Sequence, residues 1–297
     1  MAVVQTRRLG EIKRLVNLHH KGGELEIAIR KWRMEHGAVD PTPEALEFAI
    51  RLLKRQEERD VKHFHGSGLD RCLREQVLTV LGYKGDWALD TDRDAIFDDG
   101  KWRGLRWQMQ LFMMGIIKDE FHAERIFRVK KWWVKGTVDA FGELNGKPVI
   151  IEIKGANDRQ FEIVRSEGRP KQSYFWQVLV YLVLAEDLGV AVDRAIIFYE
   201  NKNTQEMQEF NVYLRDYPKE AALVRRKYRY LNRARKMKKL PGFHCSLRET
   251  DMLFRQCAQA KNCVMLAEQG KFPQTPQNLL IFKKSKRKER TFRLKLS

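Results

Sequence analysis

The spacing of apolar residues separates helical segments from strand-like ones. Apolar positions recur at helical spacing in five segments, which cover residues 26–34, 43–58, 66–83, 105–117 and 174–188. Strand-like runs, rich in β-branched and aromatic residues, cover five more, at 122–131, 133–144, 147–155, 194–200 and 208–214. Three strands, a helix and two further strands in this order predict an α/β core with a mixed sheet flanked by helices.

The same pattern divides the chain into three parts. Residues 1–60 are expected to form a helical extension, interrupted by a breaker at 39–43. Residues 61–270 hold the α/β core, and residues 271–297 form a basic tail. A strongly basic helix is expected over 219–239, after the last predicted strand.

Charge narrows the class of partner. The 297 residues include 57 Lys and Arg against 39 Asp and Glu, which gives a net charge of +18 and a pI near 9.8. The positive electrostatic field of such a protein favours binding to polyanions, nucleic acid first and an anionic membrane surface second. No apolar run approaches the ~20 residues needed to span a bilayer, and the N-terminus lacks the apolar segment of a secretory signal. We therefore expect a cytoplasmic protein with no membrane partner.

A hairpin is predicted where Asn-Gly at 145–146 separates two strand-like runs. A type I′ turn needs positive φ at both central residues, and Asn-Gly is the pair that adopts it most readily. With a two-residue loop, Leu144 faces Lys147. The same register places Asp139 directly opposite Glu152, with their Cβ atoms about 5 Å apart.

The predicted register brings together groups that can hold a metal ion. Side chains alternate with period 2, so Lys154 shares a face with Glu152 while Ile151 and Ile153 point to the other face. Opposed carboxylates, here Asp139 and Glu152, destabilise a hairpin unless something neutralises them. Mg²⁺ or Mn²⁺ would do so, acting as a Lewis acid on a phosphate and lowering the pKa of an attacking water. Lys154 could orient that water and offset charge on phosphorus. The alternative is a solvated hairpin face.

Three motifs occur in an order that resembles the RecB-like branch of the PD-(D/E)xK nuclease superfamily. They are GTVD, IIEIKG and a following helix that carries Gln177-x-x-x-Tyr181, and the resemblance covers roughly residues 66–265. It implies a restriction-endonuclease-like core and a DNA substrate, either single-stranded or at duplex ends. In that family the glutamine and the tyrosine line the active site. Positions i and i+4 share one helix face, so Gln177 and Tyr181 can do so together; a polar edge on a core helix is the alternative.

One feature of the family is absent. RecB-like nucleases usually carry a metal-binding histidine in the helix before the catalytic hairpin, whereas the corresponding segment here, IFDDGKWRGLRWQ, has none. Glu124 is an alternative metal ligand beside Asp139 and Glu152. The difference leaves open the number of metal ions and the exonuclease character.

The four cysteines are Cys72, Cys245, Cys257 and Cys263. Disulfides are not expected in the cytoplasm, so a metal or cluster site is the better expectation. One upstream cysteine followed by three near the C-terminus resembles the AddB-type iron–sulfur nucleases. That resemblance implies a C-terminal subdomain in which four thiolates hold a [4Fe–4S] cluster. Zinc in a Cys₄ site, or four unrelated buried thiols, are the alternatives.

Two basic segments are candidates for contact with DNA. The helix at 219–239 interleaves Lys and Arg with Tyr228 and Tyr230, so it could neutralise phosphates while an aromatic ring stacks on a base. A solvated helix face with core tyrosines is the alternative. The tail at 283–295 is expected to add non-specific affinity.

Together these features predict a metal-dependent DNA nuclease of the exonuclease type. Its catalytic residues would be Asp139, Glu152, Lys154, Gln177 and Tyr181. It would act in DNA processing, recombination or phage DNA metabolism, with a helicase or recombination protein as a possible partner. One alternative is a DNA-binding subunit for recombination assembly that keeps this fold but cleaves weakly or not at all. Another, a zinc-bound RNA-binding protein, fits the charge but leaves the hairpin unexplained.

Overall fold

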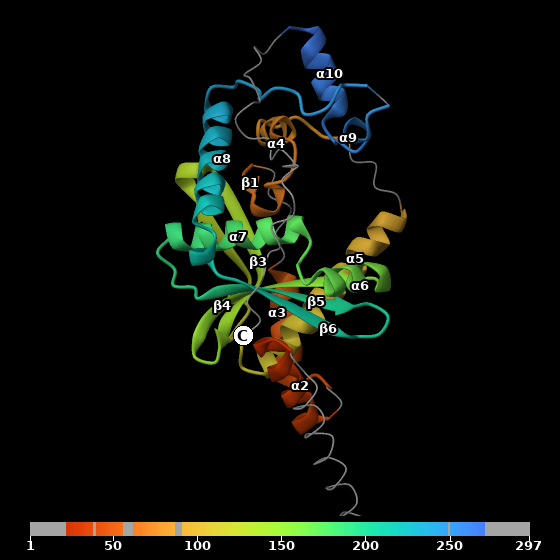
Figure 1. Cartoon of the computed structure of the whole chain (residues 1–297), viewed down its shortest axis with the longest axis vertical. Coiled ribbons are helices and arrows are strands. Elements are labelled where there is room, and N and C mark those ends of the chain that lie inside the picture. Colours follow the sequence, from red (N-terminus) through yellow and green to blue (C-terminus); the bar gives the residue numbers. More distant parts are fainter. Residues whose placement is uncertain (1–21, 38–39, 56–61, 87–90, 249, 271–297) are drawn as a thin grey trace, which may run out of the picture.

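A computed structural model describes residues 22–37, 40–55, 62–86, 91–248 and 250–270 (Figure 1). The strands are β1 Phe64–His65, β2 Ala123–Val129, β3 Val134–Leu144, β4 Lys147–Ala156, β5 Arg194–Asn201 and β6 Met207–Val212. The α-helices are α2 Glu24–His36, α3 Pro43–Lys54, α4 Leu73–Val80, α5 Thr91–Met113, α6 Asp158–Glu167, α7 Gln172–Asp187, α8 Pro218–Lys236, α9 Met252–Arg255 and α10 Ala260–Glu268. Short 3₁₀ turns lie at η1 Gly66–Gly68, η2 Lys130–Trp132 and η3 Leu214–Asp216.

The six strands form one mixed sheet. Strand β3 pairs antiparallel with β2 and β4, β4 pairs parallel with β5, and β5 pairs antiparallel with β6. Strand β1 pairs parallel with the first two residues of β3, Val134 and Lys135. Because β2 already pairs with these residues, β1 must occupy the other edge of β3, which is the edge that β4 uses further along. Strands β1 and β4 therefore share one edge of β3.

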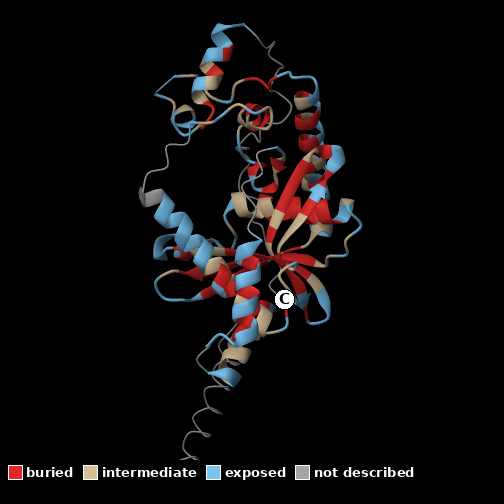
Figure 2. Ribbon diagram, turned by 180° about the vertical axis from the view of Figure 1, so that it is seen from behind, coloured by how far each residue is buried: buried red, intermediate tan, exposed pale blue. Residues whose placement is uncertain are grey.

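Both faces of the sheet are covered, which gives the chain two apolar cores. On one face α7, α8 and α4 pack over residues such as Ile150, Ile197 and Val138. On the other, α2, α3 and α5 pack over Ile151, Ile196 and their neighbours. Figure 2 shows the buried residues concentrated along the strands of the sheet. All eight residues of β5 are buried, and its continuous apolar run from Ala195 to Phe198 is what a strand covered on both faces requires.

Polar contacts fix the first helix of the described chain to the sheet. The backbone N–H of Glu26 donates to Oε2 of Glu209 on β6, 2.9 Å away. Arg194, at the start of β5 and 1% exposed, forms ion pairs with Glu24 and Asp193. Helix α2 therefore belongs to the second core and is packed against the sheet.

The predicted α/β class with a mixed sheet flanked by helices is confirmed, and so is the chain order of the five predicted strands, β2 to β6; the short strand β1 was not predicted. Helix α6 was not predicted, because its sequence is mostly polar and it buries only Phe161 and Val164. Helix α5 begins well before the predicted segment, and its residues 94–102 are exposed. The predicted tail lies outside the described residues. Among the residues that are described, no helix is long and apolar enough to cross a membrane.

Candidate active site

The β3–β4 hairpin has the register that its turn predicts. The turn residues Asn145 and Gly146 have φ of 52° and 73°, as a type I′ turn requires. The ladder runs from the pair Leu144–Lys147 to the pair Ala140–Ile151 without a bulge. The register derived from the turn is therefore confirmed over this whole ladder.

The next predicted pair, Asp139 with Glu152, does not form, and that prediction is wrong. The ladder ends at Ala140–Ile151, and Oδ2 of Asp139 instead accepts a hydrogen bond from the backbone N–H of Ile153, 2.7 Å away. Repulsion between the two carboxylates favours this separation, and further along, at Val134 and Lys135, the same edge of β3 pairs with β1. The Asp139 side chain thus satisfies a β4 donor that the β3 backbone no longer reaches.

Glu152 lies at the centre of a hydrogen-bonded group. Its side chain is 1% exposed, and its Oε1 accepts from Nζ of Lys154 at 2.5 Å and from Nε2 of Gln177 at 2.6 Å. The predicted alternation is confirmed, since Lys154 contacts Glu152 while Ile151 and Ile153 lie in the opposite core. Oε2 of Glu152 is buried and has no hydrogen-bond partner within the described residues.

Helix α7 brings the predicted Gln177 and Tyr181 to this group. Nε2 of Gln177 also donates to the Tyr181 hydroxyl, 2.7 Å away, so the two side chains share one helix face as predicted. The Tyr181 ring is 2% exposed, and a Cβ atom at Gly66 or Gly136 would lie within 3 Å of it. Glycine is therefore needed at these two positions so that β3 and the turn after β1 can approach the ring.

Glu124 reaches the same site from β2. The ladder pairs on either side of it, Ala123–Ala140 and Arg125–Val138, place Glu124 opposite Asp139. Its backbone has φ of 51°, in the left-handed region that non-glycine residues rarely adopt. Such residues cluster at functional sites.

Sequence reasoning missed one residue of this group, Gln108. It lies on α5 and is 3% exposed, and its Nε2 donates to Oε1 of Glu124 at 3.1 Å and to the backbone oxygen of Asp139 at 2.8 Å. The only signal in the sequence is a polar residue within the apolar run LRWQMQLFMM. A buried glutamine needs partners, but the sequence does not say which they are.

Burial raises the pKa values of all three carboxylates, and neighbouring carboxylates add to the effect at Glu124 and Glu152. Burial, then the charge of Asp139, raises the pKa of Glu152 to about 8, and the same two causes raise the pKa of Glu124 to about 7. The pKa of Asp139 is also raised, by burial. Burial would lower the pKa of Lys154, but Glu152 and Asp139 outweigh it and raise that pKa. Acids with shifted pKa values in one place are typical of functional sites.

The donor set fits a hard divalent cation. Carboxylate oxygens are the protein ligands that Mg²⁺ and Mn²⁺ prefer, and Oε2 of Glu152 is a buried acceptor that no described residue reaches with a hydrogen bond. In the part of the chain that is described, no three or more His, Cys, Asp or Glu side chains are already arranged to hold an ion. Asp139 is turned toward Ile153, and Oε1 of Glu152 toward Lys154. Binding of a cation would therefore require small side-chain rotations.

The cysteines lie near one another at the other end of the first core. Cys72 immediately precedes α4, Cys263 lies on α10, and Cys72 interacts electrostatically with Cys245 and with Cys257. Burial raises the pKa of Cys72, that of Cys257 to about 12 and that of Cys263 to about 11. The fold thus brings the predicted quartet into one region, although its thiols are not arranged as a ligand set among the described residues.

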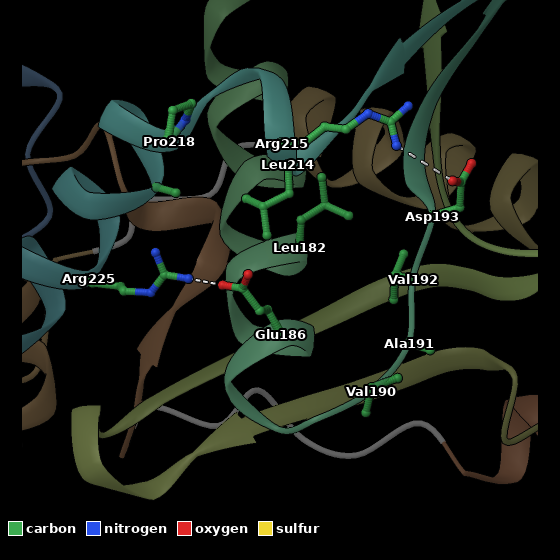
Figure 3. Close-up of a pocket in the computed structure, with 11 residues that line it drawn as sticks. Leu182, Glu186, Val190, Ala191, Val192, Asp193, Leu214, Arg215, Pro218 and Arg225 are labelled. Carbon is green, nitrogen blue, oxygen red and sulfur yellow. Dashed lines mark hydrogen bonds and ion pairs between the residues drawn. The ribbon is translucent and has the colours of Figure 1, made fainter.

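A cavity of about 520 Å³ lies away from the carboxylates, between α7 and the start of α8 (Figure 3). Its rim carries the ion pairs Arg225–Glu186 and Arg215–Asp193, and its apolar wall includes Leu182. None of the predicted site residues lines it.

Comparison with protein-family models and with curated proteins finds no match. Among solved structures, the chain is similar to the crystal structure of SSO0001, with 20% identity, a TM-score of 0.39, and 74% of this chain and 93% of that one covered. It is also similar to LHK-Exo in complex with dAMP, with 12% identity, a TM-score of 0.44, and 64% and 92% covered. A third is an alkaline exonuclease (LHK-Exo) from Laribacter hongkongensis, with 12% identity, a TM-score of 0.35, and 65% and 99% covered. Because these TM-scores lie below 0.5, function must be inferred from the site of this chain itself.

Proposed function

We propose that the chain is a metal-dependent nuclease of the exonuclease type that hydrolyses phosphodiester bonds in DNA where β3 and β4 separate. The observation that supports this most directly is the unpartnered, buried Oε2 of Glu152 within a group of mutually repelling carboxylates. A buried polar atom without a partner costs free energy. A divalent cation would offset that cost and the repulsion together. The net charge of +18 favours a polyanionic substrate.

The cation would be Mg²⁺ or Mn²⁺, held by Asp139 and Glu152, with Glu124 as a further ligand. When bound, it supplies Lewis acidity toward a phosphate and lowers the pKa of an attacking water. The raised carboxylate pKa values mean that protons compete with the cation below about pH 8. Binding is therefore expected to strengthen as the pH rises.

The remaining residues of the site orient the acidic ligands or offset the negative charge of the phosphate. Lys154 keeps its proton because neighbouring carboxylates raise its pKa, so it supplies a fixed positive charge to a phosphate during attack. Gln177 holds Glu152 through Oε1, and the Tyr181 hydroxyl accepts the second hydrogen bond of that amide. Gln108 holds Glu124 in the same way. Glu152 and Glu124 thus each have a glutamine amide that fixes their orientation, as metal sites commonly require.

The proposal is tested by substitutions with matched controls on the same hairpin. Glu152→Gln and Lys154→Ala should abolish Mn²⁺-dependent cleavage of a labelled DNA, while DNA binding in EDTA persists. Glu143→Gln and Lys147→Ala change the same charges at exposed positions of β3 and β4 and should cleave normally. Undiminished cleavage by Glu152→Gln would refute the assignment.

A second candidate is a DNA-binding recombination-assembly subunit with this fold and weak or no cleavage. The observation that favours it is Gln108, an amide on the helix where the nuclease family usually carries a metal-binding histidine. Comparing Mn²⁺-dependent cleavage with DNA binding in the wild-type chain separates the two, because the subunit would bind without cleaving. A helicase or recombination protein as partner stays a prediction.

For the cysteines we propose a [4Fe–4S] cluster, with Zn²⁺ as the alternative. Two buried cations face the quartet: Arg74, whose Nε has no hydrogen-bond partner among the described residues, and Lys227, whose pKa burial lowers to about 8. Buried cations stabilise thiolates, and a site of four thiolates carries excess negative charge. Iron and acid-labile sulfide near four per chain after anaerobic purification would support the cluster. One zinc in a colourless protein would support the alternative.

A further inference from the structure

Helix α8 presents a row of cations on one exposed face. The residues are Lys219, Arg226, Arg229, Arg233 and Lys236, all exposed, and together they are called the α8 cationic face. At about 100° per residue their side chains fall within an arc of about 100°, and at about 1.5 Å per residue they extend over about 25 Å. The buried face of the helix is apolar and includes Val224, Tyr228 and Leu231.

The charges of the α8 cationic face are not neutralised by the protein. None of its five members forms an ion pair with a carboxylate in the described part of the chain, whereas Arg225 beside them is paired with Glu186. The only acidic residue of α8, Glu220, lies off this face. Like charges three or four positions apart destabilise a helix. The helix dipole favours Arg233 and Lys236 in the last turn, but disfavours Lys219 in the first.

The shape of this face suits an extended polyanion. A hollow of about 550 Å³ at its N-terminal end is lined by Lys219, Ala222, Leu223, Arg226 and Arg229. Ala222 leaves room between the cations, so a phosphate group can approach several of them together. No large apolar side chain from Pro218 to Lys236 is strongly exposed, as insertion into a lipid surface would require.

The face is separate from the candidate active site. Helix α8 packs its buried side against α4 and α7, and it is α7 that carries Gln177 to Glu152. A polyanion on α8 therefore lies across α7 from the carboxylates. Tyr228, which the sequence offered as a ring that could stack on a base, cannot do so, because it is fully buried and its hydroxyl donates to the backbone oxygen of His65 at 3.0 Å.

From these observations we infer that the α8 cationic face binds the phosphate backbone of duplex DNA, at a distance from the segment that is cleaved. Its use as a substrate tether rests on the proposed nuclease function, but the binding itself does not. At 3.4 Å per base pair, the row of cations is as long as about seven base pairs. Binding would be independent of base sequence, because the contacts are to phosphates.

The test measures the affinity for a duplex of about 20 base pairs, longer than the row of cations, as a function of salt. EDTA is present, so cleavage plays no part and failure of the nuclease proposal would leave the result unaffected. Combining Arg226→Gln, Arg229→Gln and Arg233→Gln should lower the slope of log affinity against log salt by roughly 2 to 3, since each phosphate contact contributes about 0.9.

Two matched variants separate local binding from other effects. Lys31→Gln, Lys118→Gln and Lys147→Gln together remove the same charge at exposed positions elsewhere and should leave the slope nearly unchanged. Lysine at the three α8 arginine positions keeps the charge and should keep the slope. An unchanged slope in the glutamine variant, or an equal loss in the control, would overturn the proposal. So would α8-dependent binding to phosphatidylserine vesicles without binding to the duplex.

Discussion

Oδ2 of Asp139 accepts a hydrogen bond from the backbone N–H of Ile153 at the point where β3 and β4 stop pairing. The carboxylate therefore has two functions, as an acceptor for the sheet and as a charge in the candidate site. The two can be separated by substitution, because asparagine keeps an acceptor oxygen and alanine does not.

Asp139→Asn should fold with near wild-type stability in EDTA and lose Mn²⁺-dependent cleavage. Asp139→Ala should also lose cleavage, and should in addition be less stable by about 1–3 kcal/mol, because the N–H of Ile153 is left without an acceptor. Chemical denaturation in EDTA and a cleavage assay measure the two effects. Equal stability of the two variants would contradict the role in the sheet.

Stability without metal should fall as the pH rises from about 5 to about 8. The folded state holds protons on Glu124 and Glu152, whose pKa values are raised to about 7 and about 8, more tightly than the unfolded chain does. Folding is therefore favoured at low pH by these groups, and that contribution is lost as the pH passes their folded pKa values. Glu152→Gln removes one of them. The melting temperature of this variant relative to wild type should increase from pH 5 to pH 8. A difference in melting temperature that does not change with pH would argue against the raised pKa of Glu152.

Addition of Mn²⁺ should raise the melting temperature more at pH 8 than at pH 6. The carboxylates must lose their protons to bind the ion, and a ligand that binds only the folded state stabilises it. Glu152→Gln should lose most of this response, while Glu143→Gln, at an exposed position of β3, should keep it. Thermal unfolding with and without the ion is the measurement, and a response that does not depend on pH would be the contrary result.

Gly136→Ala should reduce both stability and cleavage. Its new Cβ would lie 2.9 Å from the Tyr181 ring and 3.0 Å from Leu184, closer than these atoms tolerate. Overpacking of this kind costs about 1–3 kcal/mol, and displacement of Tyr181 would weaken its hydrogen bond with Gln177. Gly100→Ala is the matched control, because its Cβ meets nothing within 4 Å and alanine stabilises a helix by up to about 1 kcal/mol. Normal cleavage by Gly136→Ala would show that the position of Tyr181 is not critical.

Gln108→Ala should weaken the response to Mn²⁺. The substitution removes the hydrogen bonds to Oε1 of Glu124 and to the backbone oxygen of Asp139, at a cost of about 1–3 kcal/mol in stability. Gln110→Ala on the same helix breaks the hydrogen bond with Arg33 instead, so it should lose stability but keep the metal response. Equal metal responses in the two variants would exclude Gln108 from the site.

Rules of local backbone geometry were sufficient to predict the β3–β4 hairpin from the sequence. Positive φ at Asn145 and Gly146 sets the turn, the turn sets the register, and period-2 alternation then puts Glu152 and Lys154 on one face. The i, i+4 spacing likewise placed Gln177 and Tyr181 together on α7. Each step concerns residues close in sequence, where chain geometry leaves few choices.

Contacts between distant segments were decided only by the tertiary structure. The sequence contains no signal that the β3–β4 ladder ends at Ala140 and Ile151, or that Asp139 becomes an acceptor for Ile153 and not a partner of Glu152. Nor does it contain one that α5 brings Gln108 to Glu124, and it left open whether Tyr228 contacts a base or packs in the core. Such contacts depend on which surfaces of whole elements fit together, because packing selects among pairings that local propensity leaves equivalent.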